Sequence, residues 1–227
     1  GCAMTVPDYD EPAYRDAVAE QARLRERLLL SPLPEGASLI AGADVSSEFH
    51  GRTFWGGFVV CDALEGFRPV CSAVVRMDAD FPYIPGLLAF REVPVLVEAY
   101  GRLRLKPDAT LVDAQGTAHP RRFGAAAHLG VVLDEPTVGC AKSRLCGEHE
   151  EPGGRRGDWS ALVHEGEVVG RVLRTRSGVA PVFVSPGHRS DLESAAALVL
   201  RCAPRYRIPE PIRLAHALVN EARRRER

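Results

Sequence analysis

The sequence contains no apolar run near the roughly 20 residues that a membrane-spanning helix needs. Its first residues also lack the basic region and apolar stretch of a secretory signal. We therefore expect a cytoplasmic protein that does not enter a membrane. Gly1-Cys2-Ala3 precedes Met4 and is set aside as a remnant of expression, and residues 1–10 are expected to be disordered.

An excess of charge of either sign is missing too. The 29 basic and 30 acidic residues leave a formal net charge of −1, so the charge of the whole chain does not indicate a nucleic-acid partner. The basic residues are nevertheless clustered, at 121–122, 142–144, 155–156, 171–176 and 223–227. Such clusters are compatible with phosphate contacts, although any one of them is by default a solvated surface.

Cysteine is present, but not in the pattern of a disulfide scaffold. Six cysteines are scattered over 227 residues, and a chain of this length that is 45% hydrophobic can fold around its own core. We interpret the cysteines as reduced thiols. Cys140, Cys146 and His149 offer three zinc ligands, but their spacing matches no common zinc site and a fourth ligand is missing. Zinc is therefore the minor alternative.

The pattern of apolar residues predicts helices and strands without a convincing linker or an internal repeat. Helices are expected over about 11–30, 87–105, 124–129, 191–202 and 211–224. Strands are expected over 39–46, 53–61, 70–77, 109–113, 137–141, 159–164, 168–175 and 181–184. The polar, glycine-rich stretch 148–158 is expected to be disordered.

The order of these elements indicates a single domain over residues 1–227. Three consecutive strands at the start suggest an antiparallel meander, and the later alternation of helices and strands suggests parallel pairing. We therefore predict an α/β fold of the ribonuclease H-like type. In it, a mixed sheet of three antiparallel strands followed by parallel strands is flanked by helices.

Three acidic residues are candidates for a metal site. Asp113 follows a short apolar strand, Asp44 lies among small and apolar residues, and Glu92 lies on a predicted helix. Each alone has an ordinary explanation, as a turn residue, a strand-end cap or an exposed helical glutamate. If they converge at one end of the sheet, they repel one another unless a cation compensates, and their oxygens suit Mg²⁺ or Mn²⁺. Such an ion can activate water against a phosphodiester.

The connector before the second helix is unusually stiff. Pro82 and Pro85 each fix their own φ and push the preceding residue into an extended conformation, so Tyr83 and Ile84 are held between two rigid points. A stiff aromatic and aliphatic tip suits entry into a duplex beside an extruded base. The alternative is a crossover whose tyrosine packs on the core.

Six segments together make the match specific. They are 42–46 (GADVS), 82–92 (PYIPGLLAFRE), 112–121 (VDAQGTAHPR), 136–145 (PTVGCAKSRL), 183–188 (FVSPGH) and 207–216 (RIPEPIRLAH). Through them the chain resembles the endonuclease V family of deoxyinosine 3′-endonucleases, in the same order over roughly residues 12–220. The resemblance implies a ribonuclease H-like nuclease that flips deoxyinosine out of DNA. It would cut the second phosphodiester bond 3′ to the lesion and leave 3′-hydroxyl and 5′-phosphate ends.

The resemblance also implies roles for single residues. Asp44, Glu92 and Asp113 would bind Mg²⁺, for which Mn²⁺ can substitute, and Lys142 and His216 would assist at the scissile phosphate. The wedge entering the duplex would consist of Pro82, Tyr83, Ile84 and Pro85. The pocket for hypoxanthine would be lined by Gly86, Leu88, His119, Gly124 and Ala125. Phosphate contacts are expected from Arg121, Arg122, Ser143 and Arg144.

Some positions depart from the family pattern, and some alternatives stay open. Ala114 and Ser47 stand where the family usually has glycine and a larger apolar residue, and Cys140 replaces a common valine; none is a predicted ligand. The main partner expected is DNA containing deoxyinosine, bound by a monomer. A nuclease acting on inosine in RNA, on flaps or on mismatches is an alternative, as is a binding module that has lost cleavage.

Overall fold

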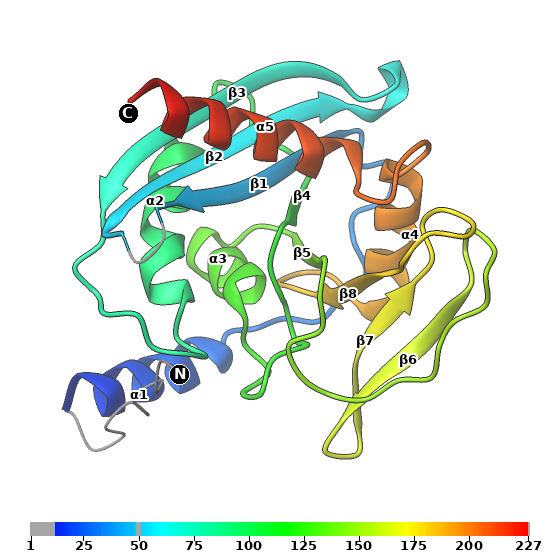
Figure 1. Cartoon of the computed structure of the whole chain (residues 1–227), viewed down its shortest axis with the longest axis horizontal. Coiled ribbons are helices and arrows are strands. Elements are labelled where there is room, and N and C mark those ends of the chain that lie inside the picture. Colours follow the sequence, from blue (N-terminus) through cyan, green and yellow to red (C-terminus); the bar gives the residue numbers. More distant parts are fainter. Residues whose placement is uncertain (1–11, 49–50, 227) are drawn as a thin grey trace, which may run out of the picture.

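The computed structural model describes residues 12–48 and 51–226. In these residues one eight-stranded sheet runs in the order β3-β2-β1-β4-β5-β8-β7-β6, with helices on both faces (Figure 1). The prediction made for residues 1–10 lies outside the described residues. Within them, no helix combines the length and the apolar character needed to cross a membrane.

The first three strands form the expected antiparallel meander. β1 (Leu39–Ser47) pairs with β2 (Thr53–Asp62), which pairs with β3 (Arg68–Asp78) across the short 3-10 turn η1 (Ala63–Glu65). β1 and β2 are buried over most of their length, as expected of strands that are covered on both faces.

The remaining strands extend the sheet in mixed directions. β4 (Ala109–Val112) and β5 (Thr137–Ala141) run parallel to β1. Beyond them lie β8 (Val182–Pro186), β7 (Glu167–Leu173) and β6 (Trp159–His164), which are antiparallel to their neighbours. The predicted order of three antiparallel strands followed by parallel ones is therefore confirmed, and the last three strands close the sheet as a second antiparallel group.

Alternation along β1 divides the core into two layers, because successive side chains of a strand point to opposite faces. Ile40 packs with α4 and α5, whereas Ala41 packs with α2 and α3. The helices are α1 (Pro12–Arg25), α2 (Ala89–Gly101), α3 (Ala125–Leu133), α4 (Leu192–Cys202) and α5 (Glu210–Arg225). Asp44, an even-numbered residue like Ile40, consequently lies on the face that α5 covers.

The first helix is shorter than the predicted range 11–30. α1 ends at Arg25 because the chain that follows is held by hydrogen bonds to a distant loop. The Leu29 amide donates to His188 Nδ1 (3.1 Å), and the Leu29 carbonyl accepts from the Arg189 amide (2.7 Å). These tertiary bonds replace the helical ones.

Residues 148–158 are not disordered, so that prediction is wrong. The buried Arg174 side chain donates to the carbonyl oxygens of Pro152 (2.9 Å) and Gly153 (3.0 Å) and pairs with Glu151 (2.9 Å). A single guanidinium group thus adds three hydrogen-bond partners to a loop whose two ends also bridge to β6 and to the residue after β7.

Candidate functional site

Asp44 and His216 meet because helix α5 lies unusually close to strand β1. A Cβ atom on Gly42 would stand 1.9 Å from the Pro211 carbonyl oxygen, so only glycine permits this approach. His216 follows on α5, and its Nδ1 lies 2.7 Å from Asp44 Oδ2. The Asp44 side chain is 8% exposed, so the imidazole is its main polar partner besides the Val45 amide.

Asp113 and Lys142 reach the same end of the sheet from β4 and β5. The Asp113 amide donates to the Ala43 carbonyl (3.0 Å), which fixes the strand end beside β1. Lys142 Nζ lies 2.5 Å from Asp113 Oδ2. Carboxyl ends of parallel strands share one edge of a sheet, and one oxygen or nitrogen each from Asp44, Asp113 and His216 lies within 4.8 Å of the others.

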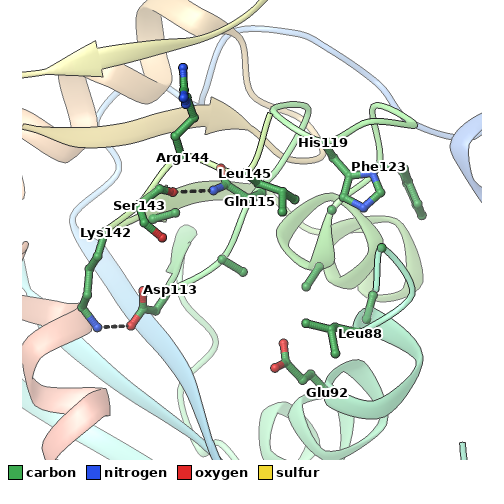
Figure 2. A pocket seen from close by; sticks show the side chains of 16 residues that line it. Leu88, Glu92, Asp113, Gln115, His119, Phe123, Lys142, Ser143, Arg144 and Leu145 are labelled. Atoms are coloured by element: carbon green, nitrogen blue, oxygen red, sulfur yellow. Dashed lines mark hydrogen bonds and ion pairs between the residues drawn. The ribbon is translucent and has the colours of Figure 1, made fainter. Parts of the chain in front are cut away.

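Glu92 adjoins this group without belonging to it. It extends from α2 into the cavity that Asp113 lines from the opposite side (Figure 2). Two of the three carboxylates predicted to converge therefore lie together with His216, while Glu92 faces Asp113 across the cavity.

The local environment disfavours the charged forms of two carboxyl groups, the half-buried Glu92 and the buried Asp44. Burial, with Asp44 and Asp113 nearby, raises the pKa of Glu92 to about 7. Burial and the charge of Asp113 also raise the pKa of Asp44, against the opposing hydrogen bond from His216. Carboxylates that disfavour one another's charge are suited to a divalent cation, which would relieve that repulsion.

A cavity of about 410 Å³ opens beside these residues, within the size range of small-molecule sites (roughly 300–1,000 Å³). All five residues predicted for the base pocket line it: Gly86, Leu88, His119, Gly124 and Ala125. Figure 2 shows His119 and Phe123 at one end and Lys142 with Asp113 at the other. The structure thus places the predicted base pocket in the same cavity as Asp113 and Glu92.

His119 is held neutral at the wall of this cavity. Burial, reinforced by Arg121 and Arg122, lowers its pKa to about 4, although a hydrogen bond to the Gly86 backbone opposes the shift. The Arg121 amide donates to His119 Nδ1 (3.1 Å), so the neutral ring carries its proton on Nε2.

The predicted wedge is divided in its exposure. Tyr83 is 58% exposed, whereas Ile84 is 5% exposed and packs with Ala17 and Leu87. Pro82 and Pro85 are exposed like the tyrosine, whereas the isoleucine is buried and anchors the connector. The expectation of a combined aromatic and aliphatic tip does not match this placement.

Of the four residues predicted to contact phosphate, two lie at the cavity and two are bonded within the protein. Ser143 and Arg144 lie on the loop after β5 at the edge of the cavity (Figure 2). Arg122 instead pairs with Glu167 (2.9 Å) and contacts the His164 ring (2.8 Å). Arg121 donates to the Gly86 carbonyl (2.8 Å). The geometry therefore gives no support to phosphate contacts by the two arginines whose guanidinium groups are bonded within the protein.

Sequence reasoning missed several supporting residues. Asn220 Nδ2 lies 3.1 Å from His216 Nε2 and donates to the His216 carbonyl (2.9 Å), while Ser46 Oγ donates to Asn220 Oδ1 (2.9 Å). The spacing of four residues on one helix could have indicated the asparagine. Gln115 Nε2 donates to the Ser143 carbonyl (2.9 Å), and no sequence signal predicts that contact.

The zinc alternative finds no support in the part of the chain that the structure describes. The groups of possible metal ligands found there do not include Cys140, Cys146 and His149. Burial raises the pKa of the Cys140 thiol well above its usual range, which disfavours the thiolate that zinc requires.

The chain matches known proteins over nearly its whole length. The family model for endonuclease V matches residues 22–217. Endonuclease V of Myxococcus xanthus is 51% identical over 211 residues, covering 92% of this chain and 89% of the relative. The crystal structure of endonuclease V from Streptomyces avermitilis superposes with a TM-score of 0.90 at 42% identity and covers 93% of each chain.

A third match is a complex. The structure of endonuclease V (D234N) from Ciona intestinalis with a 23mer DNA containing an inosine followed by a ribo-adenosine has a TM-score of 0.82 at 28% identity. It covers 94% of this chain and 98% of that one. These neighbours share the ribonuclease H-like fold, which confirms the predicted fold class.

Proposed function

Because the chain belongs to the endonuclease V family, whose members are nucleases, we propose that it recognises deoxyinosine in DNA by base flipping. It hydrolyses the second phosphodiester bond 3′ to the lesion, in the presence of Mg²⁺, and leaves 3′-hydroxyl and 5′-phosphate ends. The observation that carries this proposal is one continuous cavity, lined at one end by Asp113 and Lys142 and at the other by His119 and Phe123 (Figure 2). A base and a nearby phosphodiester of the same strand can occupy its two ends together.

The donor set fits a hard divalent cation. Asp44 and Asp113 would hold Mg²⁺ through carboxylate oxygens, with Glu92 as a third carboxylate across the cavity. When bound, the ion polarises the phosphodiester and acidifies a water molecule. Mn²⁺ prefers the same oxygen ligands and is expected to substitute.

Two cationic or proton-bearing side chains support this group. His216 Nδ1 donates to Asp44 and orients its carboxylate, and Asn220 in turn fixes the histidine ring through Nε2. Lys142 is 41% exposed and bonded to Asp113, so its ammonium group can both orient that carboxylate and offset charge that develops on a phosphate.

The other end of the cavity suits a flipped purine. Gly124 lies immediately before α3, and a Cβ atom there would stand 2.3 Å from the Gln115 carbonyl oxygen. Glycine therefore permits the Gln115 backbone to pack closely against the N-terminus of α3. The amides of a helix N-terminus favour the oxygen of a carbonyl. A pocket without room or a partner for a 2-amino group would accept hypoxanthine and exclude guanine.

Tyr83 is the side chain proposed to enter the duplex. It is exposed on the connector, two residues before Pro85 and close to the cavity residue Gly86. An aromatic ring held on a stiff, proline-bounded segment can fill the space left by an extruded base.

The test is nicking of a duplex with one deoxyinosine. We expect a labelled strand to be cut one nucleotide beyond the lesion in Mg²⁺, with a product that carries a 3′-hydroxyl end, and no cutting in EDTA or of the undamaged duplex. Binding of the deoxyinosine duplex without nicking in Mg²⁺ would favour a binding module instead.

A second candidate substrate is inosine in RNA. The relative from Ciona intestinalis was crystallised with DNA in which a ribo-adenosine follows the inosine, so that protein accommodates a 2′-hydroxyl next to the lesion. Matched inosine-containing DNA and RNA strands of one sequence would be compared in single-turnover cleavage. A faster rate on RNA would make the ribonuclease activity the primary one.

A further inference from the structure

Gln21 is a buried amide in an unexpected place. It lies on α1, far along the chain from every residue of the proposed site, and its exposed fraction is 1%. Glutamine is mostly exposed in folded proteins, and a buried amide costs stability unless its hydrogen bonds are made. The buried carboxamide must therefore be compensated by hydrogen bonds within the protein.

The carboxamide joins two walls of the cavity. Its Nε2 group lies 3.3 Å from the Gly86 carbonyl oxygen and 3.3 Å from the Phe123 carbonyl oxygen, and donates to both. Gly86 belongs to the connector that carries Tyr83, and Phe123 precedes Gly124, the N-cap residue of α3. Both residues line the cavity, so one side chain outside it ties two of its lining segments together.

Arg121 completes the arrangement. Its Nε group donates to Gln21 Oε1, and its Nη2 group donates to the Gly86 carbonyl oxygen (2.8 Å). Gly86 has φ +80°, and a Cβ atom there would stand 2.8 Å from Arg121 Nη2. The left-handed turn after Pro85 is thus shaped around this guanidinium group, which explains why Arg121 is not free to contact a phosphate.

The connector depends on such contacts because it belongs to neither a strand nor a helix. Figure 1 shows it descending from β3 to α1 before α2 begins. Ile84 and Leu87 pack against Ala17 of α1, which docks the connector on that helix but leaves the distance between Gly86 and α3 to be set by polar groups. Gln21 is the residue that bonds to both sides.

We propose that Gln21 is a positioning residue that fixes the width of the base pocket and thereby its preference for deoxyinosine over normal bases. This inference rests on the proposed function. Gln21 touches neither the acidic group nor Lys142, so it acts on recognition through Gly86 and Phe123. Its loss should therefore change which base is accepted rather than the chemistry at the phosphate.

Two substitutions separate its contacts. Gln21→Glu keeps an oxygen that accepts from Arg121 but removes the donor to the two carbonyl groups. Gln21→Leu removes both. Leu24→Ala is the matched control, because Leu24 also docks α1 but does so through apolar packing against Phe123, Ala127 and Val131. Arg121→Lys tests the same brace from its other end, since lysine cannot reproduce two directed N–H bonds.

The experiment uses the full chain and two readouts. The first is the ratio of dissociation constants for an undamaged and a deoxyinosine duplex, measured by fluorescence anisotropy without Mg²⁺. The second is the single-turnover rate at saturating enzyme with Mg²⁺. We expect Gln21→Glu and Gln21→Leu to lower the binding ratio about tenfold and the saturated rate by less than about threefold. Leu24→Ala should lower the melting temperature and keep the ratio.

The outcomes are distinguishable. A wild-type protein without preference for the deoxyinosine duplex would overturn the proposed function and this inference with it. A wild-type preference that both Gln21 variants retain would overturn the role of Gln21 alone, as would a ratio that falls equally in Leu24→Ala. If a Gln21 variant does not fold, Arg121→Lys decides the question. A ratio of dissociation constants that stays at the wild-type value in Arg121→Lys would contradict the positioning role of the Gln21–Arg121 hydrogen bonds.

Discussion

The acidic end of the site and the wall that faces it are built by different means. Asp44 and Asp113 follow from strand register: β1 and β4 pair in parallel, and their backbone bonds place both side chains at one edge. The opposite wall, at Gly86 and Phe123, is placed by side chains that bond to backbone carbonyls across long stretches of sequence. Strand pairing therefore fixes the acidic residues rigidly, whereas the side-chain hydrogen bonds of the opposite wall can be removed without disturbing the sheet.

Asp113→Ala is expected to have the largest effect. Removing a carboxylate from the acidic group should lower the single-turnover cleavage rate by at least about 1,000-fold, while affinity for the deoxyinosine duplex changes little, because the opposite wall is intact. Asp80→Ala is the control, since Asp80 is an almost fully exposed partner of Arg52. Persistent turnover in Asp113→Ala would remove this residue from the metal site.

Gly42→Ala tests whether the approach of α5 to β1 places His216. The added methyl group would stand 1.9 Å from the Pro211 carbonyl oxygen, so α5 must shift away from the strand. We expect the cleavage rate to fall about 100-fold, because small misplacements of an orienting group are costly.

Gly101→Ala is the matched control, because nothing lies within 4 Å of the Cβ position there. A rate in Gly42→Ala that equals the wild-type rate would show that the histidine does not depend on this contact. The binding ratio for the two duplexes should stay unchanged in both variants, which distinguishes this end of the site from the opposite wall.

Tyr83→Ala should affect recognition and spare the acidic group. Stacking of an aromatic side chain on a base contributes about 1–3 kcal/mol, so preference for the deoxyinosine duplex should fall about tenfold in anisotropy measurements. The affinity for Mn²⁺, measured by calorimetry, should be that of the wild type. Trp159→Ala, at an exposed aromatic on β6, is the control. An unchanged preference would reject the wedge.

The sequence predicted the acidic end better than the opposite wall, for a physical reason. Short apolar strands that contain Asp44 or are followed by Asp113 and Lys142 are local patterns, and parallel strands place their ends together. Gln21 bonds to residues 65 and 102 positions away, and nothing in its neighbourhood in the sequence marks it. The loop 148–158 was missed likewise, because its order depends on Arg174, which lies outside it.

Two buried histidines on this side of the molecule, His119 and His128, should make the free energy of unfolding depend on pH. Burial lowers the pKa of His119 and of His128 to about 4, from about 6.5 in an unfolded chain. Between these values the unfolded chain binds more protons, so the free energy of unfolding falls as the pH drops from about 6.5 to about 4. Each histidine should contribute a loss of about 2 to 3 kcal/mol, which denaturant unfolding at pH 7, 5 and 4 would measure.

His128→Phe isolates one of the two contributions. The His128 ring stacks on Phe123 and contacts Phe90 edge-on, and its Nδ1 has no hydrogen-bond partner among the described residues, so phenylalanine can occupy the space. We expect the variant to be at least as stable as the wild type at pH 7 and to lose about half as much stability by pH 4. An equal loss in both proteins would mean that the acid sensitivity arises elsewhere, with the carboxylates of the sheet edge as the next candidates.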